Sequence, residues 1–553
     1  MEERILEVMG EKRKVPKGTI FADLAKDYTD RFQGPILVAK QGNRLQELNY
    51  EVYFEEPITF LDVTDEEGMR VYQRGVSFLL VCAVRDVLGK DALTIIEHSL
   101  QKSFYCEIRR PAVEITEELL TKIEERMRQL AQADLPITKR TFRKSEAIGI
   151  LQEQGMEDKV KLQRFRRASS LNLYEMDGFY DYFYGYMPQR SSFLWNFGLM
   201  PYKDGFLLRF PDQNQPAVLR EFGNPEKVGE IFLEQMRWCA LMGVSNVADL
   251  NETITAGGFG DLIRINEALH EKKIAEIADM IGKRLDHVKM VLIAGPSSSG
   301  KTSFANRLCV QLRVLGIHPH KISLDDYFLE REQTPVDENG KRNFESIQAL
   351  DLKLLNEDLK KLVAGEEVEL PRYNFVSGKR EYKGNKIRLK PDEILVIEGI
   401  HGLNDELTSE IDSACKFHIF ISAMTQLNMD DHNHISTADS RLIRRLVRDH
   451  QFRGRDATLT ISTWSDVTDG EAENIFPFQE NADVIFNSAT IYELSVLKAY
   501  AEPLLFDVSH DSPAYVTAKR LLKFLDYFLA APETDIPNNS LMKEFIGGSC
   551  FDV

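Results

Sequence analysis

The sequence predicts a multidomain protein in which small α+β modules precede a carboxy-terminal α/β domain built on a parallel sheet. The chain has 553 residues, which at about 150 residues per domain corresponds to about three or four domains. The second observation is a change of pattern near Met290, where short apolar runs begin to alternate with helical segments as far as about Phe528. Such alternation is typical of βαβ units around a parallel sheet.

Composition excludes several kinds of protein. Hydrophobic residues make up 43% of the chain, too many for a disordered protein, and the formal net charge is −18. This acidic balance argues against a general nucleic-acid or membrane coat, although it leaves room for a local basic patch. The longest apolar run, residues 76–84, is far shorter than the roughly 20 residues that span a bilayer. The amino terminus lacks the apolar core of a signal peptide, so we expect a cytoplasmic protein.

The cysteines are scattered along the chain without a CxxC pair. This spacing disfavours a disulfide framework or a cysteine-rich zinc site, and we expect reduced, buried thiols. They are Cys82, Cys106, Cys239, Cys309, Cys415 and Cys550.

The first 62 residues combine strand-like runs with turns and one short helix. Residues 5–9 read as a strand and 21–28 as a short helix, and further strands follow with a turn at 41–43. A small β-rich α+β module fits this pattern.

Two amphipathic helices follow this module. The first, at 69–89, ends at Gly89, and the second, at 115–134, has Thr116 as its N-cap and acids in its first turn. An aromatic-rich, strand-like region lies near 170–210, and a long polar helix at 265–289 looks like a connector. The predicted units are a β-rich domain at 1–62, a second domain at 63–220, a helical connector at 221–286, an α/β domain at 287–531 and a tail at 532–553.

A glycine-rich loop follows the apolar run 290–294 and precedes a helical pattern. Its sequence, GPSSSGKT, matches G-x-x-x-x-G-K-[ST] in the required context of a strand before and a helix after. Main-chain N–H groups in such a loop converge on an anion, and the helix N-terminus adds its dipole. We therefore predict a site for the phosphates of a nucleotide, in which Lys301 reaches the β- and γ-phosphates and Thr302 ligates Mg²⁺. The phosphate-binding residues are Gly295, Pro296, Ser297, Ser298, Ser299, Gly300, Lys301 and Thr302.

Acids end the next two strand-like runs. Asp325 and Asp326 follow the run 318–324, and Glu398 ends the run 392–398. Acids at the carboxyl ends of parallel strands lie beside the bound phosphates, where one can hold Mg²⁺ and another can accept a proton from a hydroxyl. We expect these roles for Asp325 and Glu398, and a solvated loop or cap for Asp326. The chain lacks the NKxD segment of GTPases and the LSGGQ signature of ABC ATPases.

An arginine stripe lies on the helical segment 439–456. Arg441, Arg444, Arg445 and Arg448 recur at helical spacing on one face, and apolar residues fill the opposite face. Like charges at this spacing repel, so anions should compensate them. A lid that closes arginines onto transferring phosphate is the favoured interpretation; a solvated face or internal salt bridges are the alternatives.

Residues 288–528 resemble the phosphoribulokinase/uridine kinase family. The matching blocks are GPSSSGKT, SLDDYF, RNFESIQALD, LPRYNFVSGKR, LVIEGIHG, DSRLIRRLVRDHQFRGRD and ENADVIFN, in the family's order. The resemblance implies ATP- and Mg²⁺-dependent phosphorylation of a sugar hydroxyl, the 5′-OH in nucleoside kinases. It makes Asp325 the general base and, with Thr302 and Glu398, a Mg²⁺ neighbour. It also implies phosphate-contacting, catalytic roles for Lys301, Arg448 and Arg453, and substrate contacts for Glu345, Tyr373, Arg445 and Arg455.

The sequence departs from the family at the positions that read the acceptor. Glu345 replaces the aspartate that binds ribose, Gly378 replaces the base-reading histidine, and Thr463 replaces a glutamine. An extra segment, 425–436, precedes the arginine helix. Its two histidines, His432 and His434, are expected on the surface rather than as metal ligands.

The amino-terminal half resembles other families. Residues 1–62, with VPKGTIFADLAKDY and PILVAKQGNRLQEL, are similar to a TGS domain, and residues 64–212 are similar to the editing domain of threonyl-tRNA synthetase. The second resemblance places Arg74, Phe78, Phe183 and Met187 where that domain has metal ligands. None is a good ligand, so we expect the hydrolytic chemistry to be lost. His98 stands without partners and is interpreted as a core or surface residue.

Two main hypotheses remain open for the whole chain, besides a pseudokinase, which the intact Lys301, Asp325 and Glu398 disfavour. The first is an ATP-dependent nucleoside-like kinase with an amino-terminal binding or regulatory module. The second is a nucleotide-sensing partner of RNA or the ribosome that uses the TGS-like module. The acidic total and the missing GTPase signatures count against the second.

Overall fold

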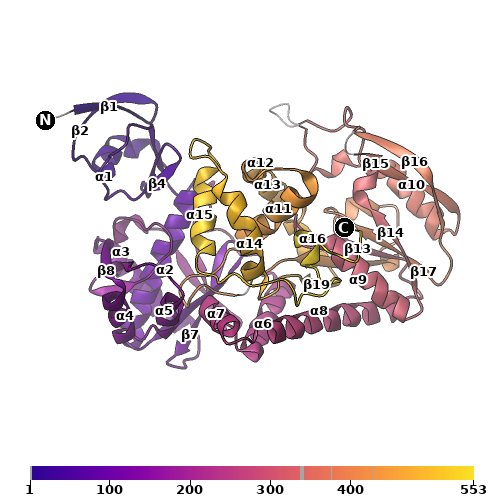
Figure 1. Ribbon diagram of the computed structural model, residues 1–553, viewed down its shortest axis with the longest axis horizontal. Coiled ribbons are helices and arrows are strands. Elements are labelled where there is room, and N and C mark those ends of the chain that lie inside the picture. The colour runs from indigo at the N-terminus through magenta and orange to yellow at the C-terminus, as the bar shows by residue number, and fades with distance from the viewer. Residues whose placement is uncertain (1–2, 337–341, 375–376, 426, 553) are drawn as a thin grey trace.

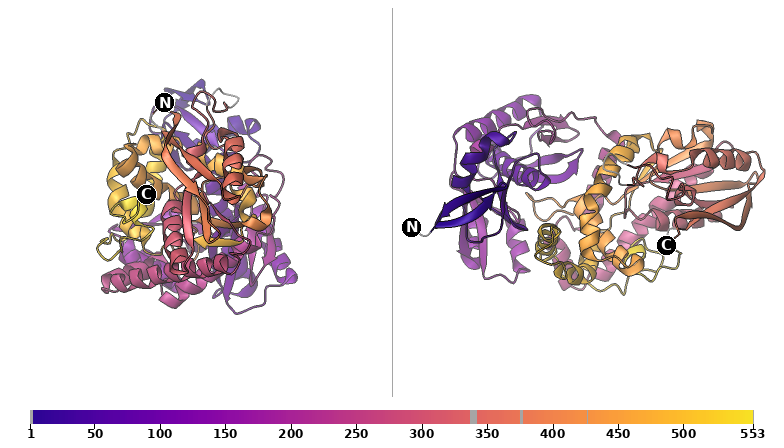
Figure 2. Two further views of the ribbon diagram at one scale, coloured as in Figure 1. Left: turned by 90° about the vertical axis from the view of Figure 1, so that its right-hand side faces the viewer. Right: turned by 90° about the horizontal axis from the view of Figure 1, so that it is seen from above.

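The computed structural model describes residues 3–336, 342–374, 377–425 and 427–552. Figure 1 shows an elongated molecule, with the amino-terminal sheets at one end and a carboxy-terminal sheet at the other. Helices α14 (Glu493–Phe506) and α15 (Tyr515–Leu525) lie between the two ends, as the view from above in Figure 2 also shows. Asn43 Nδ2 donates a hydrogen bond of 3.2 Å to the His510 carbonyl. The late helices therefore contact the first module of the chain.

The first module is a mixed five-stranded sheet with one short helix, α1 (Phe21–Ala25). Its strand order is β2-β1-β5-β3-β4, with β1 and β5 parallel and the other neighbours antiparallel. Gly42, with a φ of +55°, lies in the tight turn between β3 and β4, in agreement with the expected turn. The strands are β1 (Glu3–Val8), β2 (Glu11–Pro16), β3 (Val38–Gln41), β4 (Arg44–Gln46) and β5 (Ile58–Leu61).

The next region contains two antiparallel sheets and four helices. Helix α2 (Glu66–Leu88) ends at Gly89, and α3 (Glu117–Gln132) begins at Thr116, whose side chain accepts a hydrogen bond from the Leu119 amide, as expected for an N-cap. One sheet has the order β11-β12-β7-β6 and the other β10-β9-β8. The remaining elements are β6 (Leu93–Leu100), β7 (Ser103–Arg110), β8 (Thr138–Arg143), α4 (Lys144–Glu153), α5 (Glu157–Arg164), β9 (Ser170–Met176), β10 (Phe179–Asp181), β11 (Gly198–Tyr202) and β12 (Gly205–Arg209).

The four positions that correspond to the synthetase metal site, Arg74, Phe78, Phe183 and Met187, are occupied by side chains that are poor metal ligands. The rings of Phe78 and Phe183 are 5.4 Å apart, and Met187 is buried in the same core. Arg74 Nε donates to the Tyr186 carbonyl at 2.8 Å. In the part of the chain that the structure describes, no group of three or more His, Cys, Asp or Glu side chains is placed to hold a metal ion.

Three helices connect the two halves: α6 (Glu226–Met242), α7 (Val247–Thr255) and α8 (Phe259–Gly282). Helix α8 is the expected polar helix, although it begins at Phe259 rather than near Ile265. Its buried residues Ile274, Ile277 and Ile281 belong to the same core as the central strand of the parallel sheet. The helix is therefore part of the carboxy-terminal domain's packing as well as a link.

The carboxy-terminal sheet is parallel throughout, as predicted, with the order β14-β17-β13-β18-β19. Its central strand, β13, is fully buried, which explains its uninterrupted apolar sequence. A separate two-stranded ribbon, β15 and β16, lies beyond the sheet (Figure 1). The bounds are β13 (Met290–Ala294), β14 (His318–Ser323), β15 (Glu367–Asn374), β16 (Lys379–Arg388), β17 (Glu393–Glu398), β18 (Lys416–Ser422) and β19 (Val484–Asn487).

Helices surround this sheet and continue to the end of the chain. They are α9 (Lys301–Val314), α10 (Leu352–Val363), α11 (Thr437–Arg453), α12 (Ala457–Ser462), α13 (Trp464–Asn474) and α16 (Lys543–Ile546), besides α14 and α15. The segment expected as a tail, 532–553, is packed: Met542 and Phe545 are fully buried. None of the described helices combines the length and the apolar character needed to span a bilayer.

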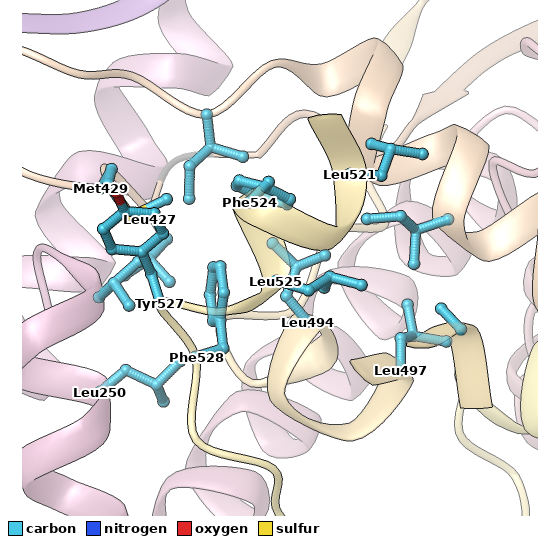
Figure 3. Packing of buried hydrophobic residues seen from close by; sticks show 14 of the residues in the cluster. Leu250, Leu427, Met429, Leu494, Leu497, Leu521, Phe524, Leu525, Tyr527 and Phe528 are labelled. Carbon is cyan, nitrogen blue, oxygen red and sulfur yellow. The ribbon is translucent and has the colours of Figure 1, made fainter. Parts of the chain in front are cut away.

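The largest core joins the two halves. Figure 3 shows Leu250 of α7 and Leu427 and Met429 of the extra segment 425–436 beside the side chains of α14 and α15. The extra segment therefore contributes apolar side chains to a core shared with late helices. The segment is an insertion relative to the family's sequence pattern, but in the fold it helps to form the core between the two halves.

Charged residues of the same segment form a buried cluster with the amino-terminal half, which we call the junction cluster: Lys159, Asp181, Asp430 and His432. Lys159 Nζ lies 2.7 Å from Asp430 Oδ1 and 3.1 Å from Asp181 Oδ1, and His432 Nδ1 lies 2.7 Å from Asp181 Oδ2. Burial opposes the charge on His432, yet Asp181 raises the pKa of this histidine above its usual value.

The prediction that His432 lies on the surface is wrong, because His432 is buried in the junction cluster. His434 is half-buried, with its ring 4.2 Å from that of Phe104. His98 lies in the core, stacked at 3.8 Å on Phe232. Of the cysteines, Cys82, Cys106 and Cys239 are buried as expected, Cys309 and Cys415 are half-buried, and Cys550 is exposed, against the expectation.

Candidate active site

The glycine-rich loop connects β13 to α9 in the expected order. Ser298 and Gly300 have φ values of +59° and +84°, so the chain reverses sharply before the helix begins at Lys301. A Cβ at Gly295 would lie 2.0 Å from the Ile421 carbonyl oxygen, which explains why this position has no side chain. The hydroxyls of Ser298, Ser299 and Ser303 are buried without a hydrogen-bond partner in the described chain. These unpaired groups indicate that the loop is shaped for a polar ligand.

Lys301 folds back over the loop. Its Nζ donates to the main-chain carbonyls of Gly295 at 2.8 Å and Pro296 at 3.0 Å. Burial lowers the pKa of Lys301, while Glu398 and Asp325 act in the opposite direction. The ammonium group thus lies at the loop, bonded only to carbonyl oxygens.

The predicted acids lie at the same edge of the sheet as the loop. Strands β14 and β17 are neighbours, with Ser323 paired to Glu398, and β17 also pairs with β13. Asp325 follows β14 in a short 3-10 helix, Leu324–Tyr327, and its side chain is exposed. The Thr302 hydroxyl donates to Glu398 Oε2 at 3.1 Å. The structure therefore brings Lys301, Thr302, Asp325 and Glu398 to one edge.

Glu398 is the buried carboxyl of this group. Burial raises the pKa of its carboxyl to about 7, against the opposing effect of Lys321 and Lys301. A divalent cation would compensate the buried carboxylate. The oxygen donors of Thr302, Asp325 and Glu398 are the hard ligands that Mg²⁺ prefers, so the residues present fit such an ion.

Asp326 has a different environment from its neighbour. Its Oδ1 accepts a hydrogen bond of 3.1 Å from the Tyr373 amide, which links the 3-10 helix to β15. This contact agrees with the structural interpretation of Asp326. It also places the buried ring of Tyr373 close to Phe328, at 5.7 Å.

Glu345, one of the predicted acceptor residues, lies against α13. A Cβ at Gly470 would lie 2.7 Å from Glu345 Cβ, so Glu345 rests directly on this helix. Burial and Glu471 raise the pKa of Glu345, and Arg445 lowers it. Gly378, at the base-reading position, has a φ of +68° and faces Arg331. Two residues of the same block, Phe375 and Val376, lie outside the described residues.

The arginine helix α11 differs from the expected lid. Arg441 and Arg444 are buried, and each pairs with a glutamate: Arg441 with Glu471 at 2.6 Å and Arg444 with Glu493 at 2.6 Å. The lid interpretation is therefore wrong for these two arginines, and the alternative of internal salt bridges is right. The physical reason is that α13 and α14 supply the anions that the sequence pattern required.

The other arginines of α11 remain close to the loop or to the end of the helix. Arg445 Nη1 donates to Ser297 Oγ at 2.9 Å. Arg448 and Arg453 share the buried carboxylate of Asp449, at 2.7 Å and 3.7 Å. The Arg455 amide donates to the Asp449 carbonyl at 3.1 Å.

Two glutamates that no motif indicated also contact the loop. Ser297 N–H donates to Glu471 Oε1 at 2.7 Å, and Ser303 N–H donates to Glu544 Oε2 at 3.1 Å. Their separations from these serines along the chain are 174 and 241 residues. No local pattern relates residues so far apart, which is why the sequence did not reveal them.

A parallel sheet with a phosphate-binding loop after its central strand, and acids after neighbouring strands, defines the class of P-loop phosphotransferases. The model of the Phosphoribulokinase / Uridine kinase family matches residues 290–495. The uridine kinase of Vibrio campbellii (strain ATCC BAA-1116) is 31% identical over 221 residues, which cover 39% of this chain and 95% of that protein. The chain belongs to the phosphoribulokinase/uridine kinase family, and its carboxy-terminal half is a kinase domain.

Other relatives match the same part of the chain. The uridine kinase of Staphylococcus aureus (strain JH9) is 31% identical over 198 residues, 35% of this chain and 84% of that protein. A solved structure described as a possible uridine kinase from Bacillus stearothermophilus is 19% identical and covers 38% of this chain and 100% of its own, with a TM-score of 0.24. The family match begins at residue 290. The resemblances of residues 1–62 to a TGS domain and of 63–220 to a synthetase domain therefore stay predictions.

Proposed function

We propose that this protein transfers the γ-phosphoryl group of ATP to a sugar hydroxyl, in particular the 5′-OH of a nucleoside-like acceptor. One observation carries the proposal: Lys301, Thr302, Asp325 and Glu398 lie at the same edge of one parallel sheet, where neighbouring strands end. That arrangement would provide a phosphate-binding loop, oxygen ligands for a cation and a carboxylate for proton transfer. Membership of the family supports the same reaction class.

The loop residues 295–302 would bind the phosphates through their amides, and Lys301 would leave its carbonyl partners for the β- and γ-phosphates. Thr302, Asp325 and Glu398 would hold Mg²⁺, which when bound neutralises charge on the phosphate oxygens. Asp325, exposed at the edge, would accept the proton of the attacking hydroxyl.

Arginines at the end of α11 would complete the site. Arg448 and Arg453, which share Asp449, would contact the transferring phosphate, and Arg445 and Arg455 would contact the substrate. Their guanidinium groups suit phosphate oxygens because each presents several donors in one plane.

The acceptor would lie between Glu345 and Tyr373. Glu345 would accept hydrogen bonds from sugar hydroxyls, and the buried aromatic Tyr373 would contact the base. Gly378 and Thr463 offer fewer polar atoms than the histidine and glutamine expected from the resemblance. Base recognition should therefore be relaxed or directed at a different base.

A panel of nucleosides and sugar alcohols with Mg²⁺ and ATP tests the proposal through acceptor-dependent ADP release. We expect Asp325→Asn to lower kcat by about 100- to 10,000-fold, the contribution of a positioned general base. ATP binding should survive this change. Asp326→Asn is the matched control, because an asparagine oxygen can still accept from the Tyr373 amide. Near-normal turnover of Asp325→Asn would exclude the assigned base.

The second hypothesis, an RNA- or ribosome-binding protein, has one observation in its favour. Tyr50, Tyr53 and Phe54 of the first module are exposed, and the guanidinium of Arg44 lies 5.0 Å from the centre of the Phe54 ring. Exposed aromatics beside cations can stack on bases. RNA that copurifies with the full chain and is lost with Tyr53→Ala and Phe54→Ala would favour it.

A further inference from the structure

The carboxy-terminal segment contacts an amide in the first turn of α9, directly after the phosphate-binding loop. Helix α9 begins at Lys301, so the N–H of Ser303 lies in its first turn and has no partner within the helix. This N–H donates to Glu544 Oε2 at 3.1 Å, and Glu544 is only 9% exposed. First-turn amides of the helix after such a loop are the groups that bind phosphate. The carboxylate of Glu544 therefore occupies an anion position of the nucleotide site.

Apolar side chains fix the segment that carries this carboxylate. Leu541 belongs to the same core as α9 and β13, and a Cβ at Gly300 would lie 3.0 Å from Leu541 Cδ2. Met542 and Phe545 are fully buried, and the guanidinium of Arg444 lies 4.9 Å from the centre of the Phe545 ring. Ser540 Oγ donates to Glu267 Oε1 at 2.6 Å. The backbone is thus held in place, and only the Glu544 side chain has to rotate for its carboxylate to leave Ser303.

Glu544 differs from the other glutamate on the loop. Glu471 accepts from Ser297 N–H, but Arg441 compensates its charge through two hydrogen bonds of 2.6 Å and 2.7 Å. Glu544 forms no ion pair within 4.0 Å among the described residues. The negative charge of Glu544 also acts to raise the pKa of Glu398 and that of Lys301. Glu471 is therefore a fixed, charge-compensated support of the loop, whereas Glu544 carries a negative charge that has no ion-pair partner among the described residues and would repel a phosphate.

We propose that Glu544 is an intramolecular competitor of the nucleotide. In the empty enzyme its carboxylate takes the Ser303 amide, and ATP must displace it before the phosphates can settle on the loop. A carboxylate and a phosphate cannot share this N–H, and their like charges repel at close range. The end of the chain thereby sets the affinity for ATP and prevents occupation of the loop by weakly bound anions. This inference rests on the proposed binding of ATP at residues 295–302.

Titration calorimetry of ATP with the full chain, at fixed Mg²⁺, tests the proposal. We expect Glu544→Gln, which keeps the shape and removes the charge, to bind ATP about 10- to 100-fold more tightly, the scale of one hydrogen bond to a charged group. Glu544→Ala should act in the same direction. Glu533→Gln is the matched control, because Glu533 lies on the same segment but pairs with Tyr500 and Lys543.

The outcomes separate this inference from the proposed function. If the wild-type chain binds ATP, Lys301→Ala does not, and Glu544→Gln binds no more tightly than the wild type, then Glu544 only caps α9 and the inference is overturned. If no variant binds ATP, both proposals fail. Thermal unfolding of each variant shows whether the segment remains packed, and Glu544→Ala gives a second reading if the glutamine variant unfolds early.

Discussion

The active-site edge, which consists of Lys301, Thr302, Asp325 and Glu398, and the junction cluster both contain buried or partly buried charges. They differ in whether those charges have ion-pair partners within the chain. In the junction cluster, Lys159, Asp181 and Asp430 have no exposed side-chain surface, and every charge has a partner at 2.7–3.1 Å. At the active-site edge, Asp325 and Glu398 form no ion pair with the described residues, and Lys301 bonds only to carbonyl oxygens.

The difference suggests a criterion: buried charges that are paired within the chain stabilise the fold, whereas those without a partner are available to a ligand. Removing charge from water costs several kcal/mol per ion in an order-of-magnitude estimate, and a partner must offset that cost. The junction cluster finds its partners inside the chain and so fixes one half against the other. The active-site edge leaves its acids and three loop hydroxyls for a ligand, which is the pattern of a site prepared for chemistry.

Replacing Lys301 of the active-site edge and Lys159 of the junction cluster by the same residue is the sharpest test of this comparison. Lys301→Met should lower kcat by at least about 1,000-fold, because the lysine would contact the phosphates in the transition state. The unfolding temperature should change by no more than about 2 °C, since Lys301 makes no ion pair. Coupled ADP release and thermal unfolding measure the two effects. A large loss of stability with retained activity would show that Lys301 has a structural role rather than a catalytic one.

Lys159→Met should have the opposite profile. It leaves Asp430 buried without a cation and Asp181 with His432 as its one partner in the junction cluster, which should destabilise the fold by about 3 kcal/mol. Denaturant unfolding measures the loss, and kcat of the folded fraction should stay within a factor of about 2, because the lysine lies outside the proposed site. The double variant Lys159→Met/Asp430→Asn is the control and should recover part of the stability. An unchanged unfolding midpoint for Lys159→Met would contradict the structural role.

Two arginines one turn apart on α11 extend the test. Arg444→Lys should cost about 2 kcal/mol of stability, because lysine cannot keep both bonds to Glu493 and the bond to the Ser488 carbonyl. Arg448→Lys should leave stability unchanged and lower kcat by about 30-fold, since its guanidinium would contact the transferring phosphate. Steady-state kinetics and thermal unfolding of both variants test these two roles. Equal losses of stability would contradict the distinction between a structural Arg444 and a catalytic Arg448.

The smallest expected effect is a pH dependence at the junction. Burial and Asp158 raise the pKa of Asp431 to about 7, and Lys159, Asp430 and His432 also face this group. The folded state therefore binds the proton more tightly than the unfolded state. The resulting stabilisation is present below the ordinary carboxyl pKa and is lost as the pH rises towards 7. The raised pKa of His432 acts with the same sign.

We expect the unfolding temperature to fall by about 2 °C between pH 5 and pH 8 because of these groups. Asp431→Asn should remove most of this slope, whereas substitution of the exposed Asp30 should not. A slope that is the same in Asp431→Asn and in the wild type would show that Asp431 does not titrate in this range.

Local patterns were enough to predict the residues of the phosphate-binding loop and the acids that follow it. An apolar run, a glycine-rich turn and a helical pattern are contiguous, so β13, the loop and α9 could be recognised from residues 290–314 alone. The ends of β14 and β17 could also be recognised from local sequence. Because the carboxyl ends of parallel strands lie at one edge of a sheet, Asp325 and Glu398 were predicted to lie together.

The partners of charged residues were not predictable in the same way. The arginine stripe indicated that anions were needed, but only the fold shows that Glu471 and Glu493 supply them for Arg441 and Arg444. Likewise, the polar sequence of residues 425–436 suggested a surface loop, because its partner Lys159 lies 271 residues from Asp430 in the chain.

The sequence by itself determined the family, the parallel sheet and the residue types that carry phosphate chemistry, because these depend on short-range periodicity and contiguous motifs. Tertiary structure alone decided which charges are neutralised within the chain and which are left for a ligand. It also decided that Glu544, 241 residues from Ser303, rests on the phosphate-binding loop. Such contacts depend on how distant elements pack, and packing is a property of the whole fold rather than of any segment.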